Sequence, residues 1–160
     1  MLTARPLSIW DAAFCWRLAN DPDVRASAVD RRPPTWVGHC KWMLAWLFKR
    51  DRQAWVIRSG RPVFDWWVNG NETVYWEYRT AGLARVGRDG TVSIEVLPSH
   101  RGQGVGIRGV RIATEYAERH GWDTPTAHIR DENGASIGLF AKAGYRMAGA
   151  SRGWVRMERA

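Results

Sequence analysis

The sequence predicts a mixed α/β fold, and three of its patterns carry that prediction. Apolar residues recur at helical spacing in the first fifty residues and again over residues 107–119. Between these regions, residues 54–86 hold short runs of β-branched and aromatic residues, which are typical of antiparallel strands. The run Thr91–Leu97 alternates between two faces in the manner of a half-buried strand.

Two helices are expected near the N-terminus. Ser8 is placed to cap a helix from Ile9 to about Asn20, with Asp11 completing an approximate capping box. Thr35 is placed to cap a second helix from Trp36 to about Arg50. The tryptophans of the second helix widen its apolar face beyond what one contact with a sheet would bury, so we expect another element to cover them.

Two or three antiparallel strands are expected in the middle of the chain. Turn signals break the pattern at Ser59-Gly60, Asn69-Gly70 and Ala81-Gly82, and Asn-Gly is the strongest hairpin signal of the three. The C-terminal part then predicts four further elements. They are a helix over 107–119 ended by Gly121, a strand at Thr126–Arg130, a helix from about Asn133 to Ala143 ended by Gly144, and a hairpin over Tyr145–Met157 that turns near Ser151–Gly153.

Length and composition bound the class of protein. A chain of 160 residues has the size of one ordinary domain, and no repeat or linker interrupts it, so residues 1–160 are expected to form a single domain. No stretch approaches the roughly 20 apolar residues of a membrane-spanning helix. The N-terminus lacks the pattern of a secretory signal, so a cytoplasmic protein without a membrane partner is expected. Cys15 and Cys40 are expected to be buried free thiols, and no metal site is predicted.

The formal net charge of +8 predicts affinity for an anionic partner. A polyphosphate cofactor, a nucleotide-linked substrate, nucleic acid and a membrane surface all qualify, and charge alone does not choose among them. The arginines are scattered along the chain, which equally fits an ordinary solvated surface.

One glycine-rich segment, from Val96 to Gly106, links the alternating strand to the helix over 107–119. Glycine at alternate positions lets the backbone approach a ligand and turn its N–H groups inward, where the positive end of a helix dipole begins. The segment therefore predicts a pyrophosphate cradle. The turn of dinucleotide-binding folds uses the same physics, but here the glycine spacing differs and the loop follows antiparallel hairpins instead of opening a first βαβ unit.

The motif in this loop resembles the cofactor motif of the GNAT superfamily of acyl-CoA-dependent N-acetyltransferases. That motif is Arg or Gln, two residues, Gly, one residue, then Gly or Ala, and the run Arg101-Gly102-Gln103-Gly104-Val105-Gly106 matches it. The lead-in Ile94-Glu95-Val96-Leu97-Pro98 matches as well. Downstream residues resemble the second motif of the family, so that the resemblance runs from about Ala81 to the C-terminus; they are Asn133, Ser136, Leu139, Phe140 and the Gly144-Tyr145 pair.

The resemblance implies a GNAT fold, in which a mixed, mostly antiparallel central sheet flanked by helices is splayed between the central strand and the next strand. It also implies transfer of acetyl from acetyl-CoA, as co-substrate, to a primary amine. The backbone near Val96 and Leu97 would bond to the pantetheine arm, and Asn133 and Phe140 would line its path. The pyrophosphate would lie on the cradle formed by Arg101, Gly102, Gln103, Gly104, Val105 and Gly106.

Phe140 departs from the family, because many members place there a tyrosine that can protonate the departing thiolate. Phenylalanine has no proton to give. The coenzyme A thiolate therefore leaves without a dedicated acid, or water or a tyrosine elsewhere supplies the proton.

Two residues are candidates for the base that the attacking amine needs. Glu95 is the first, because strand alternation places it on the face opposite Ile94 and Val96, next to the backbone that meets pantetheine. An ion pair with an arginine is an equally good explanation of this carboxylate. His128, on the adjoining strand, is the second candidate, although a lone strand histidine is more often structural.

The substrate side is less determined. The stretch from Trp16 to Arg25, followed by His39-x-x-Trp42, resembles members that acetylate nucleotide-linked amino sugars and members that acetylate the N-termini of ribosomal proteins. Arg25 is a candidate for substrate binding, and Trp42 and Trp46 are candidates for stacking on a sugar or base, although packing or a dimer interface explains most tryptophans. The segment Arg61–Thr80 is longer than a usual hairpin and is a candidate for shaping the acceptor pocket.

Two further functions stay open at this point. An enzyme that modifies nucleic-acid bases would reconcile the cradle with the positive charge. A non-catalytic module that binds coenzyme A or nucleic acid would explain the missing tyrosine, with interleaved arginines and aromatic residues holding a single strand. A small-molecule or peptide amine remains the favoured partner, and the family resemblance is compatible with a monomer or a homodimer.

Overall fold

The computed structural model describes residues 1–28, 30–65 and 73–160. The strands are β1 (Leu2–Pro6), β2 (Arg52–Asp65), β3 (Thr73–Gly87), β4 (Val92–Val96), β5 (Thr126–Arg130), β6 (Tyr145–Ser151) and β7 (Trp154–Arg159). The helices are α1 (Ala12–Asn20), α2 (Pro22–Ser27), α3 (Trp36–Phe48), α4 (Val105–Arg119) and α5 (Gly134–Lys142), with short 3-10 turns η1 (Ile9–Asp11) and η2 (Pro98–His100).

The strands form two sheets that meet at one place. The first sheet has the order β1-β2-β3-β4 and the second the order β5-β7-β6, and all the pairings within each sheet are antiparallel. A parallel bridge between Thr91 and Thr126 joins the two sheets at the start of β4 and β5. No ladder of further pairs continues from this bridge within the described residues. The predicted splay between the central strand and the next strand is therefore present, and the α/β class is confirmed.

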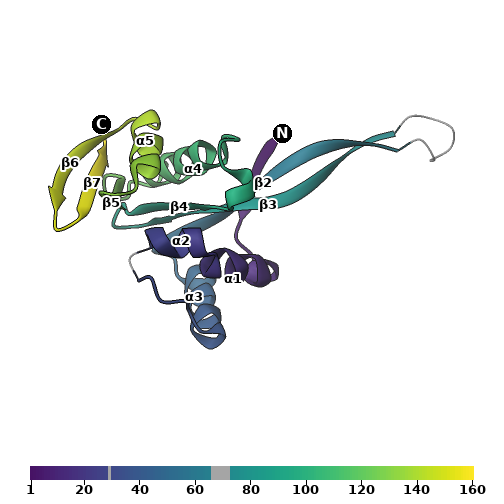
Figure 1. Cartoon of the computed structure of the whole chain (residues 1–160), viewed down its shortest axis with the longest axis horizontal. Coiled ribbons are helices and arrows are strands. Elements are labelled where there is room, and N and C mark those ends of the chain that lie inside the picture. The colour runs from purple at the N-terminus through teal and green to yellow at the C-terminus, as the bar shows by residue number, and fades with distance from the viewer. Residues whose placement is uncertain (29, 66–72) are drawn as a thin grey trace.

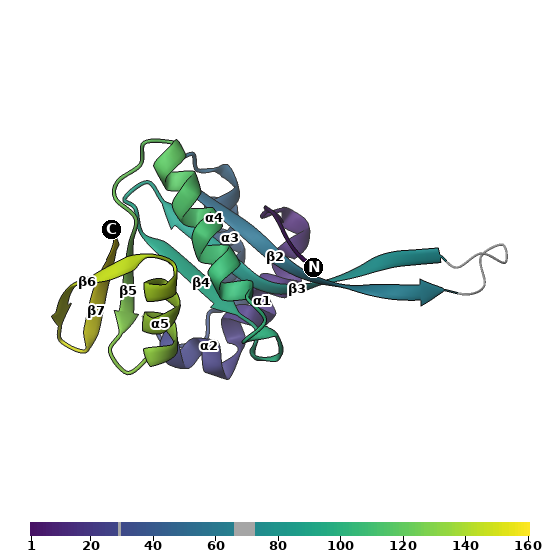
Figure 2. The ribbon, with the colours of Figure 1, turned by 90° about the horizontal axis from the view of Figure 1, so that it is seen from above.

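Helices cover both faces of the sheets (Figure 1). α4 and α5 lie on one face, whereas α1, α2 and α3 lie on the other, and Figure 2 shows α4 crossing the first sheet beside α5. The larger core cluster packs α4 against both sheets, with Val86, Val110 and Ala127 almost fully buried. A second cluster packs Phe14 and Leu18 of α1 against β2 and β3. The larger cluster thus spans both sheets on the α4 face, and the second cluster fixes α1 on the opposite face of the first sheet.

Most predicted elements lie where the sequence placed them. Asp11 accepts a hydrogen bond from the Ser8 N–H at 2.9 Å, as the predicted capping box requires, although Ile9–Asp11 is a 3-10 turn and the α-helix begins at Ala12. The Thr35 hydroxyl accepts a hydrogen bond from the Gly38 N–H at 3.2 Å, which confirms the cap of the second helix. The second helix ends at Phe48 instead of continuing to Arg50. Trp42 and Trp46 pack against the cluster of α1 with the sheet, which is the cover that was expected for them, whereas Phe48 at the end of the helix is 78% exposed.

The predicted breaks in the middle of the chain were wrong at two sites. Gly60 and Gly82 lie inside continuous strands, because each makes room for a neighbour: a Cβ on Gly60 would come within 2.6 Å of the Tyr78 ring, and one on Gly82 within 2.7 Å of the Glu95 carbonyl oxygen. Asn69-Gly70 lies outside the described residues. Beyond the body, β2 and β3 continue together as a projecting two-stranded arm (Figure 1).

Two elements were not predicted. β1 pairs with β2 at the N-terminus. α2 begins at Pro22, after the Asp21 side chain accepts hydrogen bonds from the N–H groups of Asp23 and Val24. The run Asn20-Asp21-Pro22 therefore ends one helix and also starts the next.

The bridge between the sheets requires glycine at position 90, because the Gly90 backbone lies against that of Thr124 and its carbonyl accepts a hydrogen bond from the Thr126 N–H at 2.8 Å. Gly90 and Gly121 both have a positive φ, of 76° and 61°, but a Cβ on Gly90 would overlap the Thr124 backbone oxygen whereas one on Gly121 would meet nothing within 4 Å. We predict that Gly121→Ala lowers the unfolding free energy by about 1 kcal/mol, the cost of the left-handed conformation. Gly90→Ala should cost at least about 2 kcal/mol more, because backbone must also shift. Urea denaturation of the two variants measures the difference, and equal losses would contradict this account of Gly90.

Candidate functional site

The splay between β4 and β5 opens into a continuous cavity of about 1270 Å³. We call the boundary between these two strands the seam. Both strands line the cavity, together with the N-terminal end of α4, the first turns of α5, and residues of α1, α2 and α3 on the other face. Helices from both faces of the sheet therefore contribute residues to one cavity at the seam.

The loop before α4 is shaped to hold an anion. Gly102 and Gly104 have φ values of 74° and 79°, a conformation that favours glycine, and Gly104 is the N-cap of α4. Among the described residues, no backbone carbonyl accepts a hydrogen bond from the N–H groups of residues 102–107. These donors lie at the positive end of the α4 dipole, and Gly102, Gly104 and Gly106 line the cavity. The residues present thus fit a phosphate or pyrophosphate group.

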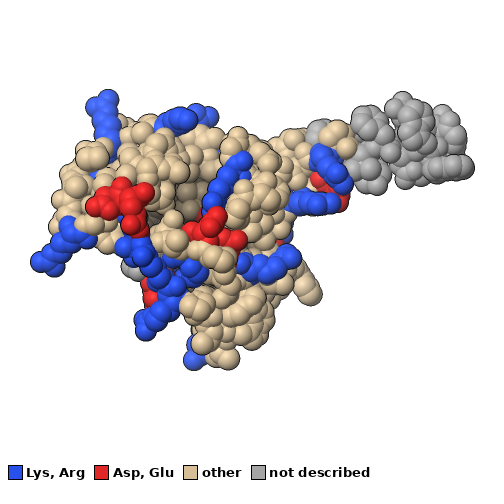
Figure 3. Space-filling view, in the orientation of Figure 1, with Lys and Arg blue, Asp and Glu red and all other residues tan. Residues whose placement is uncertain are grey.

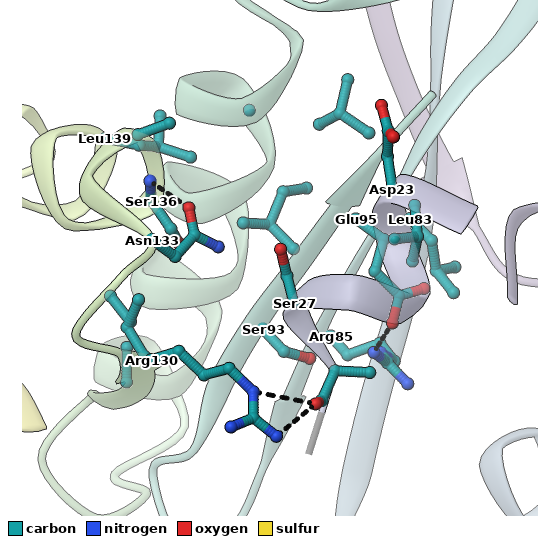
Figure 4. Close-up of a pocket in the computed structure, with 18 of the residues that line it drawn as sticks. Asp23, Ser27, Leu83, Arg85, Ser93, Glu95, Arg130, Asn133, Ser136 and Leu139 are labelled. Atoms are coloured by element: carbon teal, nitrogen blue, oxygen red, sulfur yellow. Dashed lines mark hydrogen bonds and ion pairs between the residues drawn. The ribbon is translucent and has the colours of Figure 1, made fainter. Parts of the chain in front are cut away.

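Gly106 has a different reason to be glycine. A Cβ there would come within 2.9 Å of the Leu139 side chain, so its absence lets α5 pack closely on α4. α5 in turn is capped by Asn133, whose Oδ1 accepts a hydrogen bond from the Ser136 N–H at 3.1 Å (Figure 4). Asn133, Ser136, Leu139 and Phe140 therefore form the α5 wall of the cavity.

The opposite side of the seam carries polar side chains from both strands. Ile94 packs toward Gly109 of α4, so Ser93 and Glu95, at alternate positions of β4, point to the face covered by α1 and α2. On β5, Ala127 and Ile129 belong to the α4 core, so His128 and Arg130 point to the same face as Ser93 and Glu95.

Glu95 is held in an ion pair with Arg85 of β3 (Figure 4). Its side chain is 20% exposed and that of Arg85 is 16% exposed, so the pair is largely shielded from water. The Arg85 guanidinium also lies over the rings of Trp42 and Trp46, at 5.4 and 5.7 Å from their centroids. The alternative explanation of Glu95, a strand carboxylate paired with an arginine, is therefore realised, although the residue also lines the cavity.

Three polar contacts connect α2 and the residues after it to the far side of the cavity. The Arg130 guanidinium donates two hydrogen bonds to the Ala28 carbonyl, at 3.1 and 3.2 Å. Arg31 pairs with Glu132 at 2.5 Å, and the Arg101 side chain pairs with Asp23 at 2.9 Å. α2 and the residues after it are thus tied to the opposite wall of the cavity instead of standing apart from it.

Comparison with known proteins agrees with this geometry. The family model described as the acetyltransferase (GNAT) domain matches residues 1–146. The chain belongs to the GNAT acetyltransferase family. An uncharacterized N-acetyltransferase of Methanocaldococcus jannaschii is 23% identical over 120 residues, which are 73% of this chain and 50% of that protein. The chain therefore spans about half the length of this relative.

Solved structures show the same fold. A crystal structure of a domain from Methanocaldococcus jannaschii has a TM-score of 0.78 at 18% identity, covering 99% of this chain and 97% of that one. Spermidine N-acetyltransferase of Vibrio cholerae, in complex with CoA and spermine, has a TM-score of 0.71 at 16% identity, covering 98% and 92%. None of the helices in the described part of the chain is long and apolar enough to cross a membrane.

The GNAT motif residues predicted from the sequence take three kinds of position. Val96, Arg101, Asn133 and Phe140 line the cavity, with the three cradle glycines. Leu97 packs toward α1 and donates its N–H to the Ala81 carbonyl at 2.9 Å. Two others do not line the cavity with their side chains: Gln103 donates to the Ser99 carbonyl at 3.0 Å, and Val105 is buried in the core.

The predicted substrate residues are also divided. Arg25 lines the cavity and donates to the Asp30 carbonyl at 3.0 Å. Trp42 lines it too, but its ring is stacked on His39 and lies beside Arg85. Trp46 is not among the lining residues, and its ring contacts Arg52 and Arg85 instead. For these two tryptophans the geometry favours a packing role over stacking on a substrate.

Sequence reasoning missed Arg85, Ser93 and Arg130, all of which line the cavity. Ser93 could have been predicted to lie at the site, because strand alternation places it on the same face as Glu95. Arg85 and Arg130 could not be found in the same way, because their partners lie on other elements and the strand register decides the contact.

No tyrosine lines the cavity among the described residues, so Phe140 is not replaced by a nearby phenol. Tyr145 lies just behind Phe140, at 5.0 Å between ring centroids, and its hydroxyl is 2.6 Å from the Thr114 hydroxyl. Burial raises the pKa of Tyr145 to about 12, against a smaller opposing effect of the Thr114 hydrogen bond. This phenol therefore has no route to a thiolate in the cavity.

We predict that Tyr145→Phe leaves the pH dependence of acetyl transfer unchanged. The same variant should lower the unfolding free energy by about 1 kcal/mol, because one buried hydrogen bond is lost while Thr114 keeps its bond to the Val110 carbonyl. Rates measured from pH 6 to pH 10 beside urea denaturation test both parts. Loss of the alkaline limb of the rate profile would make Tyr145 the missing acid and contradict its placement behind Phe140.

Proposed function

We propose that this protein transfers the acetyl group of acetyl-CoA to a primary amine that enters from the α2 side of the cavity. The observation that carries the proposal is the set of N–H groups of residues 102–107, which open on the cavity without a backbone acceptor. They suit the pyrophosphate of the co-substrate. From there the seam would take the pantetheine arm between Val96 and the α5 wall.

Acetyl-CoA supplies an activated acyl group, and the residues of this chain position the amine that attacks it. Glu95 and His128 face the acceptor half of the cavity and are the proposed groups for handling the amine and its protons. In the reaction the amine nitrogen forms a bond to the carbonyl carbon, the carbon–sulfur bond breaks, and the thiolate leaves. Because Phe140 has no proton to give, the sulfur takes its proton from the amine or from water.

Charge in the cavity supports an acceptor that is not a polycation. The described lining has five basic and three acidic side chains. Figure 3 shows basic and acidic groups gathered around α2 and the seam, whereas the lobe formed by α3 is mostly uncharged. An excess of positive charge suits a phosphorylated co-substrate and also an acceptor that carries phosphate. A nucleotide-linked amino sugar therefore fits better than a polyamine such as the spermine bound by the Vibrio cholerae structural neighbour.

The contacts that hold α2 across the cavity also favour a small acceptor over a protein N-terminus or a base in nucleic acid. The Arg130 bonds tie the residue after α2, Ala28, to β5 across the cavity, and the Arg31–Glu132 pair adds a second tie between the same two parts of the chain. A protein that only binds coenzyme A or nucleic acid would not need polar side chains from both strands, such as Glu95 and His128, on one face of the seam.

The cradle is tested by calorimetric titration with acetyl-CoA. Gly102 lines the cavity with a positive φ, and a Cβ there would meet nothing within 4 Å. Asp and Asn both tolerate this conformation and differ in charge. We predict that Gly102→Asp weakens acetyl-CoA binding at least tenfold relative to Gly102→Asn, because a carboxylate would face the pyrophosphate.

Two further variants complete this experiment. Gly104→Trp should abolish binding by filling the cradle, and Gly121→Trp, also at a positive φ, controls for backbone strain. Equal affinities of the Asp and Asn variants for acetyl-CoA would show that the pyrophosphate does not bind at this loop. Absence of binding to the unmodified protein would overturn the proposed transfer reaction itself.

The acceptor class is tested by rates of coenzyme A release with three amines. We predict a kcat/KM at least tenfold higher for a nucleotide-linked amino sugar than for spermidine or for a short peptide with a free N-terminus. The reason is the excess of basic side chains in the cavity together with the closure by α2. A preference for spermidine would show that Glu95 and Asp23 dominate the acceptor half, against this proposal.

A further inference from the structure

The proposed reaction must release a proton from a partly closed site. At neutral pH a primary amine arrives as R–NH₃⁺, and the products are R–NH–CO–CH₃ and coenzyme A with a protonated sulfur. Two protons leave the nitrogen; one ends on the sulfur and the other must reach bulk water. This inference rests on the proposed function and concerns the route of that second proton.

The register at the seam sets polar side chains from the two strands side by side. Counting from the parallel bridge Thr91–Thr126, Ser93 of β4 stands level with His128 of β5, and Glu95 stands level with Arg130. Residues level with each other in parallel strands point to one face. Figure 4 shows Ser93 and Arg130 projecting to the same side of the seam. Ser93 and His128 therefore stand at the narrow end of the splay, between the reaction site and the bridge.

His128 lines two cavities. One is the main cavity, and the other is a polar groove beyond the bridge, of about 860 Å³. Besides His128, only residues outside the main cavity line the groove. On β7, Arg156 is the register partner of His128, and Glu158 is that of Thr126, so both point into the groove. An exposed imidazole at the junction of the two spaces can receive a proton on one side and release it on the other.

Three other titratable groups that line the main cavity are less suited to this task. Glu95 is already bonded to Arg85, so a proton on that carboxylate would break the ion pair. His39 is 3% exposed, and its Nε2 lies 3.2 Å from the Ala12 carbonyl oxygen. Burial lowers the pKa of its imidazole. The thiol of Cys15 is also buried, which raises its pKa to about 12.

We propose that His128 carries the surplus proton of acetyl transfer from the main cavity to the groove beyond the Thr91–Thr126 bridge. In the main cavity, Glu95 and Arg130 are the charged residues nearest to His128 in the strand register. The groove is lined by the carboxylates of Asp89, Asp123 and Glu158, which attract a departing proton, and it opens to bulk water, which accepts it. The charged groove residues that face His128 are Asp89, Asp123, Arg156 and Glu158.

The test compares His128→Gln with His120→Gln in the full chain. His120 is exposed, stacks on Tyr116 and lines neither cavity, so it controls for loss of an imidazole. We expect His128→Gln to lower kcat at least tenfold in weak buffer while the KM for acetyl-CoA stays within twofold. Added imidazole should restore at least half of the lost rate, because a small base can enter the open groove and take over the transfer.

The outcomes distinguish failure of the proposed proton route from failure of the proposed acetyl transfer. An unchanged kcat and pH profile in His128→Gln, or a loss that imidazole does not restore in a variant with the wild-type melting temperature, would overturn the proton route alone. Absence of acetyl transfer by the wild-type protein to any amine of the panel, despite tight acetyl-CoA binding, would instead overturn the proposed function. Loss of activity in both variants would show that His128 has no special part, and would also refute the route.

Discussion

The structure depends on one constraint: β4 and β5 touch at the Thr91–Thr126 bridge and then part. A continuous ladder there would close the sheet and leave no cavity. The strands can stay apart because each is paired on its other side, β4 with β3 and β5 with β7, and because α4 packs across the first sheet. The backbone groups that this parting leaves unpaired are suited to bonding the amide groups of a pantetheine arm.

The two faces of the seam have separate tasks that follow from their helices. On one face the long helix α4 offers its positive end, and its glycines admit both a ligand and the neighbouring helix α5. On the other face α1, α2 and α3 bring aromatic rings and charged side chains, which fix Arg85 and through it Glu95. The proposed cofactor side is thus built mainly from backbone, and the proposed acceptor side from side chains, so the second can vary without loss of the first.

This division explains which parts of the molecule could be predicted from the sequence. The cradle is local: glycine spacing, the preceding strand and the following helix lie within about a dozen residues, and Gly102 and Gly104 adopt the positive φ that the pattern requires. Strand alternation placed Glu95 on the correct face. The ion pair with Arg85 and the contact of Arg130 with Ala28 join elements far apart in sequence, and only the register between strands decides them. α2 was missed because six residues give too little periodicity, and the residues that cap it were interpreted only as the end of the preceding helix.

Glu95 also shows why a motif position does not define a chemical role. The strand pattern predicts the face on which Glu95 lies, and the family resemblance implies its place beside the pantetheine arm. The Arg85 guanidinium, fixed between Glu95 and two indole rings, already occupies one carboxylate oxygen. A carboxylate in this state remains an effective partner for an incoming ammonium group, because opposite charges attract strongly where water is scarce. It is poorly placed to keep a proton, since protonation would leave Arg85 without its counter-ion. In the proposed reaction, binding the amine and exporting its proton would therefore fall to different residues, with the second task at the narrow end of the seam.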